Sequence, residues 1–98
     1  MQLRLVRRQH PPHFQRFYTE LGLRLKQLRR KKGYTQEDMI SFGFGVRHWQ
    51  QIEAGYPINI WTLLRICEAF EVRMWQIVKG LDDAFPSQHG RDLKPIKS

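Results

Sequence analysis

Cysteine is almost absent from this chain of 98 residues, in which Cys67 is the only one. A single cysteine excludes an internal disulfide and is typical of proteins in a reducing compartment. Cys67 also lies within an apolar helical pattern, which favours a buried, inert thiol. One cysteine and four scattered histidines match no known metal-ligand spacing. No nucleophile–base set and no phosphate-binding loop is visible either, so we expect neither an enzyme nor a cofactor.

Long apolar runs are also missing. No run approaches the roughly 18 residues that a membrane-spanning helix needs, and the first residues, MQLRLVRR, lack the apolar centre of a signal peptide. We therefore expect a cytoplasmic protein with no membrane partner. A hydrophobic content of 41% and a charged content of 27% predict one small soluble domain with tails left over.

Acidic residues are scarce in the first third of the chain. Residues 1–32 contain ten Lys/Arg and one acid (+9), residues 33–80 contain four and five (−1), and residues 81–98 contain three of each, which together give the net charge of +8. A clustered basic region is typical of a nucleic-acid-binding protein. The alternative is a solvated basic surface with no partner.

Apolar residues recur with helical spacing along most of the chain. Between His13 and Lys32 they are Phe14, Phe17, Tyr18, Leu21, Leu25 and Leu28. Gly22 costs about 1 kcal/mol in a helix interior, so this helix is expected to bend or to begin there. Asn59 can cap a later helix over residues 60–70, and a short helix over residues 73–79 is expected to follow. The residues of the 60–70 helix that would face the core are Leu63, Ile66, Cys67 and Phe70.

Residues 35–55, TQEDMISFGFGVRHWQQIEAG, predict two short helices joined by a glycine turn. The hydroxyl of Thr35 can cap the first helix. In the second, residues 46–53, Trp49 and Ile52 fall on one face. The residues on the opposite face are Val46, Arg47, Gln50 and Gln51. Arg pairs with guanine and Gln with adenine in the major groove, so this face could read DNA. Polar residues opposite an apolar stripe also occur on any surface helix.

This stretch resembles the helix-turn-helix of the Cro-like, xenobiotic-response-element (XRE) family of phage and bacterial repressors. The matching residues are Gln36, Gly43, the run from Gln51 to Gly55, the run from Thr62 to Ile66, Phe70, Val72, Arg29 and Gly33, within residues 21–78. The spacing from Gln36 to Glu53 is one residue shorter than usual. Met39 or Ile40 replaces a small alanine, Trp49 replaces an Ile or Val, and Glu71 replaces a glycine. The larger residues at the first two of these positions predict a wider helix pair with an altered tilt, and Glu71 predicts a different turn after its helix.

The resemblance implies an all-α, five-helix, phage-repressor-like domain over residues 13–80, between a basic N-terminal arm (1–12) and a flexible C-terminal tail (81–98). It implies sequence-specific binding of double-stranded DNA by a nucleoid-associated transcriptional repressor, a homodimer on palindromic sites. The residues expected to contact bases are Val46, Arg47, Gln50 and Gln51. Those expected to contact the DNA backbone are Gln36, Gly45, His48, Gly55 and Tyr56. Arg29 and Glu53 would form a pair that ties the first helix to the reading helix, or two exposed charges of little consequence.

Two other functions stay open. One is the antitoxin of a toxin–antitoxin pair, which would bind DNA with the same fold and a small toxin with another surface, such as Phe14, Phe17 and Tyr18 or the tail. The other is a protein-interaction module with no DNA role, in which Trp61 and Trp75 belong to the working surface. Trp75 is expected either to cover the core or to form a dimer contact.

Overall fold

A computed structural model describes residues 11–85 of the chain. In chain order, these residues form α1 (Pro12–Lys31), η1 (Glu37–Phe42), α2 (Val46–Glu53), α3 (Ile60–Phe70), α4 (Met74–Val78) and η2 (Leu81–Ala84), where η denotes a 3-10 helix. All regular secondary structure in the described part of the chain is thus helical, as expected, with no strand. Residues 1–10 of the expected arm and residues 86–98 of the expected tail lie outside it.

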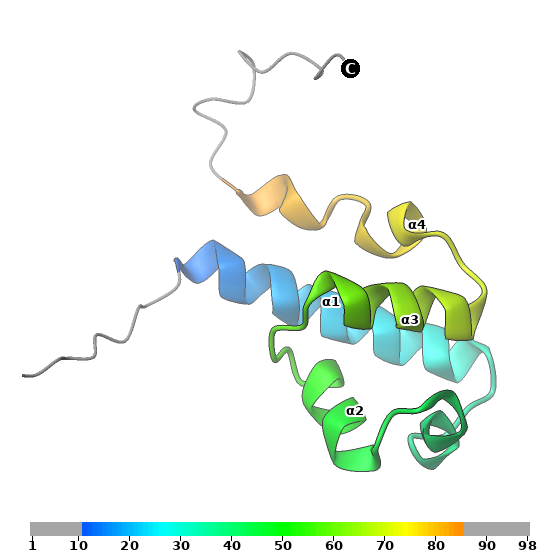
Figure 1. Cartoon of the computed structure of the whole chain (residues 1–98). Coiled ribbons are helices and arrows are strands. Elements are labelled where there is room, and N and C mark those ends of the chain that lie inside the picture. Colours follow the sequence, from blue (N-terminus) through cyan, green and yellow to red (C-terminus); the bar gives the residue numbers. More distant parts are fainter. Residues whose placement is uncertain (1–10, 86–98) are drawn as a thin grey trace, which may run out of the picture.

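Helix α1 is the element around which the others pack. It contacts α2, α4 and η2. In Figure 1, α1 and α3 cross the middle of the molecule, with α2 and η1 on one side and α4 and η2 on the other. The two groups of short helices are therefore presented on opposite sides of the longest helix.

A buried glycine sets the distance between α1 and α2. Helix α1 begins at Pro12 and continues through Gly22. A Cβ at Gly22 would lie 2.6 Å from the carbonyl oxygen of Glu53 and 2.7 Å from that of Ile52. Only a residue without a side chain lets the last turn of α2 approach α1 this closely. The helix therefore does not begin at Gly22, whose role is to admit α2.

The apolar core draws on every helix. Its buried members are Leu21, Leu25, Met39, Phe44, Trp49, Ile52, Leu63, Ile66, Cys67, Phe70, Ile77 and Leu81. The Trp49 ring is fully buried and lies edge-on to Phe44, with ring centroids 5.3 Å apart, and to Phe70, at 5.9 Å. Met39 is buried, whereas Ile40 is 57% exposed. Of the two candidates for the position where the resemblance implies an alanine, Met39 is therefore the one in the core. Burial also raises the pKa of the Cys67 thiol, which keeps it protonated and unreactive.

The segment before α2 is a 3-10 helix rather than an α-helix. Thr35 caps it as expected: its hydroxyl accepts from the Asp38 N–H at 3.1 Å, and the Asp38 carboxylate accepts from the Thr35 N–H at 2.7 Å. A 3-10 helix rises about 2.0 Å per residue against about 1.5 Å in an α-helix, so six residues span the length of about eight. The segment therefore covers more length for each residue than an α-helix would.

The turn after α3 places a glutamate in a conformation that favours glycine. Glu71 has φ 57° and ψ 47°, in the left-handed region. Its N–H donates to the Glu68 carbonyl at 3.2 Å, and the Val72 N–H donates to the Cys67 carbonyl at 3.0 Å. This is the Schellman pattern, which the glycine turns after α1 and α2 also form. The turn therefore keeps the glycine geometry without glycine, at a cost of about 1–2 kcal/mol.

Residues 81–85, where the tail was expected to begin, pack against the helical domain, and Leu81–Ala84 form η2. Leu81 is 6% exposed, and the ring of Phe85 lies 5.5 Å from that of Phe14 between centroids. Arg24 of α1 fixes the preceding turn, because its Nη1 donates to the carbonyls of Ile77 at 2.8 Å and Lys79 at 2.6 Å. Only two of these five residues, Leu81 and Phe85, have large apolar side chains, which is too few for sequence periodicity to detect.

Candidate nucleic-acid interface

Helix α2 has one face in the core and one in solvent. Trp49 and Ile52 are buried, as the helical spacing predicts. Arg47 and Gln50 are exposed, and Val46 and Gln51 are partly exposed. The four residues expected to contact bases thus lie on the accessible side of a helix whose other side is anchored.

A shallow hollow collects several of these side chains. It has a volume of about 300 Å³ and is lined by Arg47, Gln50, Gln51, Ala54 and Tyr56. Tyr56, expected to contact the DNA backbone, is 56% exposed. The structure therefore places this aromatic side chain beside three of the four expected base-contacting residues.

A buried ion pair holds α2 against α1. Arg29 Nε lies 2.6 Å from Glu53 Oε2 and Arg29 Nη2 lies 3.1 Å from Glu53 Oε1, a two-point contact. Arg29 is 6% exposed and Glu53 is 9% exposed, so these are not surface charges. Arg29 Nη1 also donates to the Tyr34 carbonyl at 2.8 Å. The expected pair is present, and it fixes the orientation of α2 as well as its position.

Glu53 accepts more hydrogen bonds than the ion pair alone supplies. The Trp49 indole N–H donates to its Oε2, and Gln36 Nε2 donates to its Oε1 at 3.0 Å. Burial alone would raise the pKa of Glu53, but hydrogen bonds from Arg29, Gln36 and Trp49 outweigh it and hold the pKa below its ordinary value. The Trp49 N–H is satisfied inside the core, which makes this large side chain acceptable there.

Gln36 connects this buried carboxylate to the exposed face of α2. Its Oε1 accepts a hydrogen bond from Gln50 Nε2 at 3.1 Å, while its Nε2 donates to Glu53. The DNA-backbone contact expected of Gln36 stays a prediction, and in this structure its side-chain amide bonds to two residues of α2. Gln36 is 14 residues from Gln50, and nothing in the sequence pattern indicates that they meet.

The remaining residues expected to contact the DNA backbone differ in accessibility. Gly45 and His48 are exposed at the start of α2. Gly55 is buried, and its N–H donates to the Ile52 carbonyl at 3.1 Å. The Tyr56 N–H likewise donates to the Gln51 carbonyl at 3.0 Å. These turn amides complete the end of α2 and are not available to a phosphate, so the contact expected from the backbone at Gly55 is not supported.

Arg65 of α3 fixes the turn that leads into α2, a role that sequence reasoning missed. Its Nη2 donates to the carbonyls of Phe42 at 3.3 Å and Gly43 at 3.1 Å. Its guanidinium carbon also lies 4.3 Å from the ring centroid of Phe44 and 4.9 Å from that of Trp61. A lone arginine in an apolar helix gives no sign in the sequence of the turn that it contacts.

Comparison with family models, curated proteins and solved structures gave no match for this chain. Within residues 11–85, no group of three or more His, Cys, Asp or Glu side chains could hold a metal ion. None of the helices in that range is long and apolar enough to cross a membrane. The function of the α2 face must therefore be inferred from its own geometry.

Proposed function

We propose that this protein binds double-stranded DNA in a sequence-specific manner, with η1 and α2 acting as a helix-turn-helix and α2 entering the major groove. The observation that carries the proposal is that α2 has one face exposed to solvent and the other buried in the core. Arg47 and Gln50 project into solvent from a helix that Trp49 and the Arg29–Glu53 pair hold rigidly in place. Side chains that read bases must be held in this way to discriminate between them.

The exposed side chains have the chemistry of base recognition. Arg47 can donate two hydrogen bonds to the O6 and N7 atoms of guanine. Gln50 gives one amide hydrogen to Gln36, which leaves its carbonyl oxygen and its second N–H for the N6 and N7 atoms of adenine. Val46 and Gln51 extend the same face. An eight-residue helix is about 12 Å long and fits a major groove about 12 Å wide.

Basic side chains at the end of α1 add positive charge that favours binding to nucleic acid. Arg30, Lys31 and Lys32 are exposed at the end of α1, where the chain turns toward η1. Such charges add affinity without sequence information. Tyr56 and His48 flank the exposed residues of α2 and are further candidates for phosphate contacts.

We further propose that the protein represses transcription as a homodimer on palindromic sites. Trp75 of α4 is 60% exposed, so it does not cover the core, and it offers an apolar contact for a second copy. A dimer of this kind would place its half-sites about one helical turn, roughly 10–10.5 bp, apart.

Selection of bound sequences from a random pool of DNA duplexes tests this proposal. We expect enrichment of a short motif with two-fold symmetry for the full chain. The Arg47→Ala variant should lose the preference at one G·C position. Arg16→Ala, which removes the same charge from the exposed surface of α1, is the matched control and should keep the motif. Absence of any enrichment with the natural chain would contradict the proposal.

A further inference from the structure

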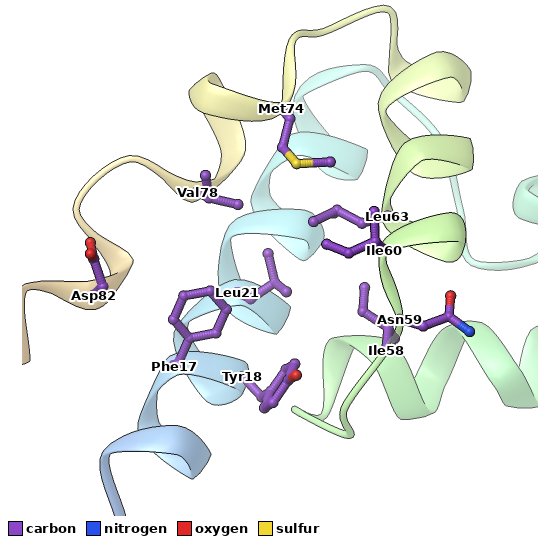
Figure 2. A pocket seen from close by; sticks show the side chains of 10 residues that line it. All are labelled: Phe17, Tyr18, Leu21, Ile58, Asn59, Ile60, Leu63, Met74, Val78 and Asp82. Atoms are coloured by element: carbon purple, nitrogen blue, oxygen red, sulfur yellow. The ribbon is translucent and has the colours of Figure 1, made fainter. Parts of the chain in front are cut away.

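We propose that the apolar groove between α1, α3 and α4 is a docking site for an amphipathic helix of a partner protein, with basic residues beside its apolar face. The groove has a volume of about 430 Å³. Eight of its ten lining residues are aliphatic or aromatic or carry a thioether. Figure 2 shows Phe17 and Leu21 of α1 facing Leu63 of α3 and Val78 of α4 across this space.

The groove continues into a second apolar hollow along α1. This hollow has a volume of about 260 Å³, shares Phe17 and Tyr18 with the groove, and adds Phe14 and Phe85. From Phe14 to Leu21 the apolar stripe covers seven helical steps, about 10 Å, which matches two turns of a partner helix. Partner helices that bind grooves use apolar anchors at this spacing, with contacts at i, i+3 or i+4, and i+7.

The rim of the groove leaves apolar surface in solvent. Ile60 is 62% exposed and Phe14 is 39% exposed. Exposed apolar side chains beside an apolar groove offer further contact area to a partner. The groove is only partly enclosed. This suits a helix better than a small molecule, because pockets for small ligands enclose most of the ligand surface.

Charge identifies the kind of partner. Asp82 is the only charged side chain among the described residues that line the groove, and it lies at the end opposite Asn59 (Figure 2). Its neighbour Asp83 is exposed but does not line the groove. In a chain of net charge +8, the carboxylate of Asp82 favours a basic partner at this end of the groove and disfavours DNA. It lies on the side of α1 away from α2, so a partner and DNA can bind together (Figure 1).

Titration of the full chain with a synthetic leucine–lysine helix tests this inference, with a leucine–glutamate helix of the same pattern as the matched probe. NMR should show shifts at the methyl groups of Ile58, Met74 and Val78 on addition of the basic helix. The acidic helix should not shift them, although overall charge attracts it to this basic protein. Asp82→Lys should weaken binding of the basic helix about tenfold, since an attraction becomes a repulsion. Asp83→Lys is the control and should weaken it less than about twofold.

Ile60→Lys places a charge on the exposed wall at the far end of the groove and should also weaken binding about tenfold. This second variant keeps the test decisive if Asp82→Lys lowers the melting temperature. Arg47→Ala should bind the basic helix normally, so failure of the DNA proposal can be recognised separately. The inference is overturned if the groove methyl groups do not move, if both helices shift them equally, or if the two aspartate variants behave alike. Concentration-dependent shifts without any peptide, together with a dimer in sedimentation, would assign the groove to a second copy of this chain instead.

Discussion

The side-chain amide of Gln50, on the exposed face of α2, donates to the side-chain oxygen of Gln36 at 3.1 Å, and Gln36 donates to the buried carboxylate of Glu53 at 3.0 Å. A residue proposed to read a base is thus connected through one side chain to the ion pair that orients its helix. Substitution of Gln36, which is not on α2, can therefore test the base contact proposed for Gln50.

If Gln36 orients Gln50, then Gln36→Ala and Gln50→Ala should not act independently on DNA binding. We expect each to cost about 1–2 kcal/mol at the selected site, because each removes or misplaces one bidentate contact. The double variant should cost little more than either single one. Binding to sites with a substituted A·T pair gives the readout. Costs that simply add would show that Gln36 has no part in orienting Gln50.

Acid should destabilise the fold through Glu53. Its pKa in the folded protein lies below the ordinary value of 4.5. The stability that it contributes is therefore complete above pH 4.5 and is lost as the pH falls through the folded pKa. The free energy of unfolding of the natural chain, measured with urea, should fall steeply below that pH. Glu53→Gln should cost about 3–5 kcal/mol at neutral pH, because it leaves Arg29 buried without its counter-charge, and should show a shallower acid dependence. Equal acid dependence in the two proteins would show that Glu53 is not the group responsible.

Gly22→Ala should destabilise the protein, although alanine is the better helix former by about 1 kcal/mol. The added Cβ meets backbone carbonyls of α2 that cannot move aside without shifting the helix, so we expect a net loss of about 2–3 kcal/mol. Thermal and urea unfolding measure this loss. Gly45→Ala is the control, since its Cβ would meet no atom within 4 Å, and it should change the stability little. A Gly22→Ala protein as stable as the natural one would mean that α1 and α2 are not packed this closely.

Glu71→Gly should stabilise the protein by up to about 1 kcal/mol. Glycine removes the left-handed strain at φ 57°, and its greater freedom in the unfolded chain offsets part of the gain. Gly33→Ala is the converse control, because it introduces an alanine at φ 83° with no atom within 4 Å of its Cβ, and should cost about 1 kcal/mol. Both values come from denaturant unfolding. A loss of stability in Glu71→Gly would indicate that the glutamate side chain contributes more than its backbone conformation costs.

The sequence predicts the helices well because their apolar residues repeat with helical spacing. Trp49 and Ile52 in the core, the capping hydroxyl of Thr35 and the pair between Arg29 and Glu53 all follow from local pattern or from the family resemblance. What the sequence does not predict depends on contacts between distant residues. In the sequence, Gly22 only indicates a less stable position in a helix. Its packing against the end of α2, about 30 residues later, is visible only in the structure. The carbonyl bonds of Arg24 and Arg65, and the packing of Phe85 on Phe14, likewise join residues more than 20 positions apart.

The winding of η1 also escapes sequence reasoning. The missing residue between Gln36 and Glu53 predicts a trimmed helix, but the choice between a shorter α-helix and a 3-10 helix depends on the distance that the segment must span. Met39 and Ile40 are neighbours of similar character, and only the position of η1 against the core decides that Met39 is buried. Both side chains are apolar and similar in size, so the sequence pattern does not distinguish them and tertiary packing decides which one is buried.

The central claim is that the exposed face of α2 reads DNA sequence, and its most direct test is the affinity of Arg47→Ala for the selected site and for a scrambled duplex at one salt concentration. We predict that the variant loses about 1–3 kcal/mol at the selected site, that its affinity for the scrambled duplex changes much less, and that its melting temperature is that of the natural chain. Arg16→Ala should lower both affinities slightly and equally, as the loss of a charge alone would. The claim is contradicted if Arg47→Ala weakens both duplexes to the same extent, or if the natural chain itself does not distinguish between them.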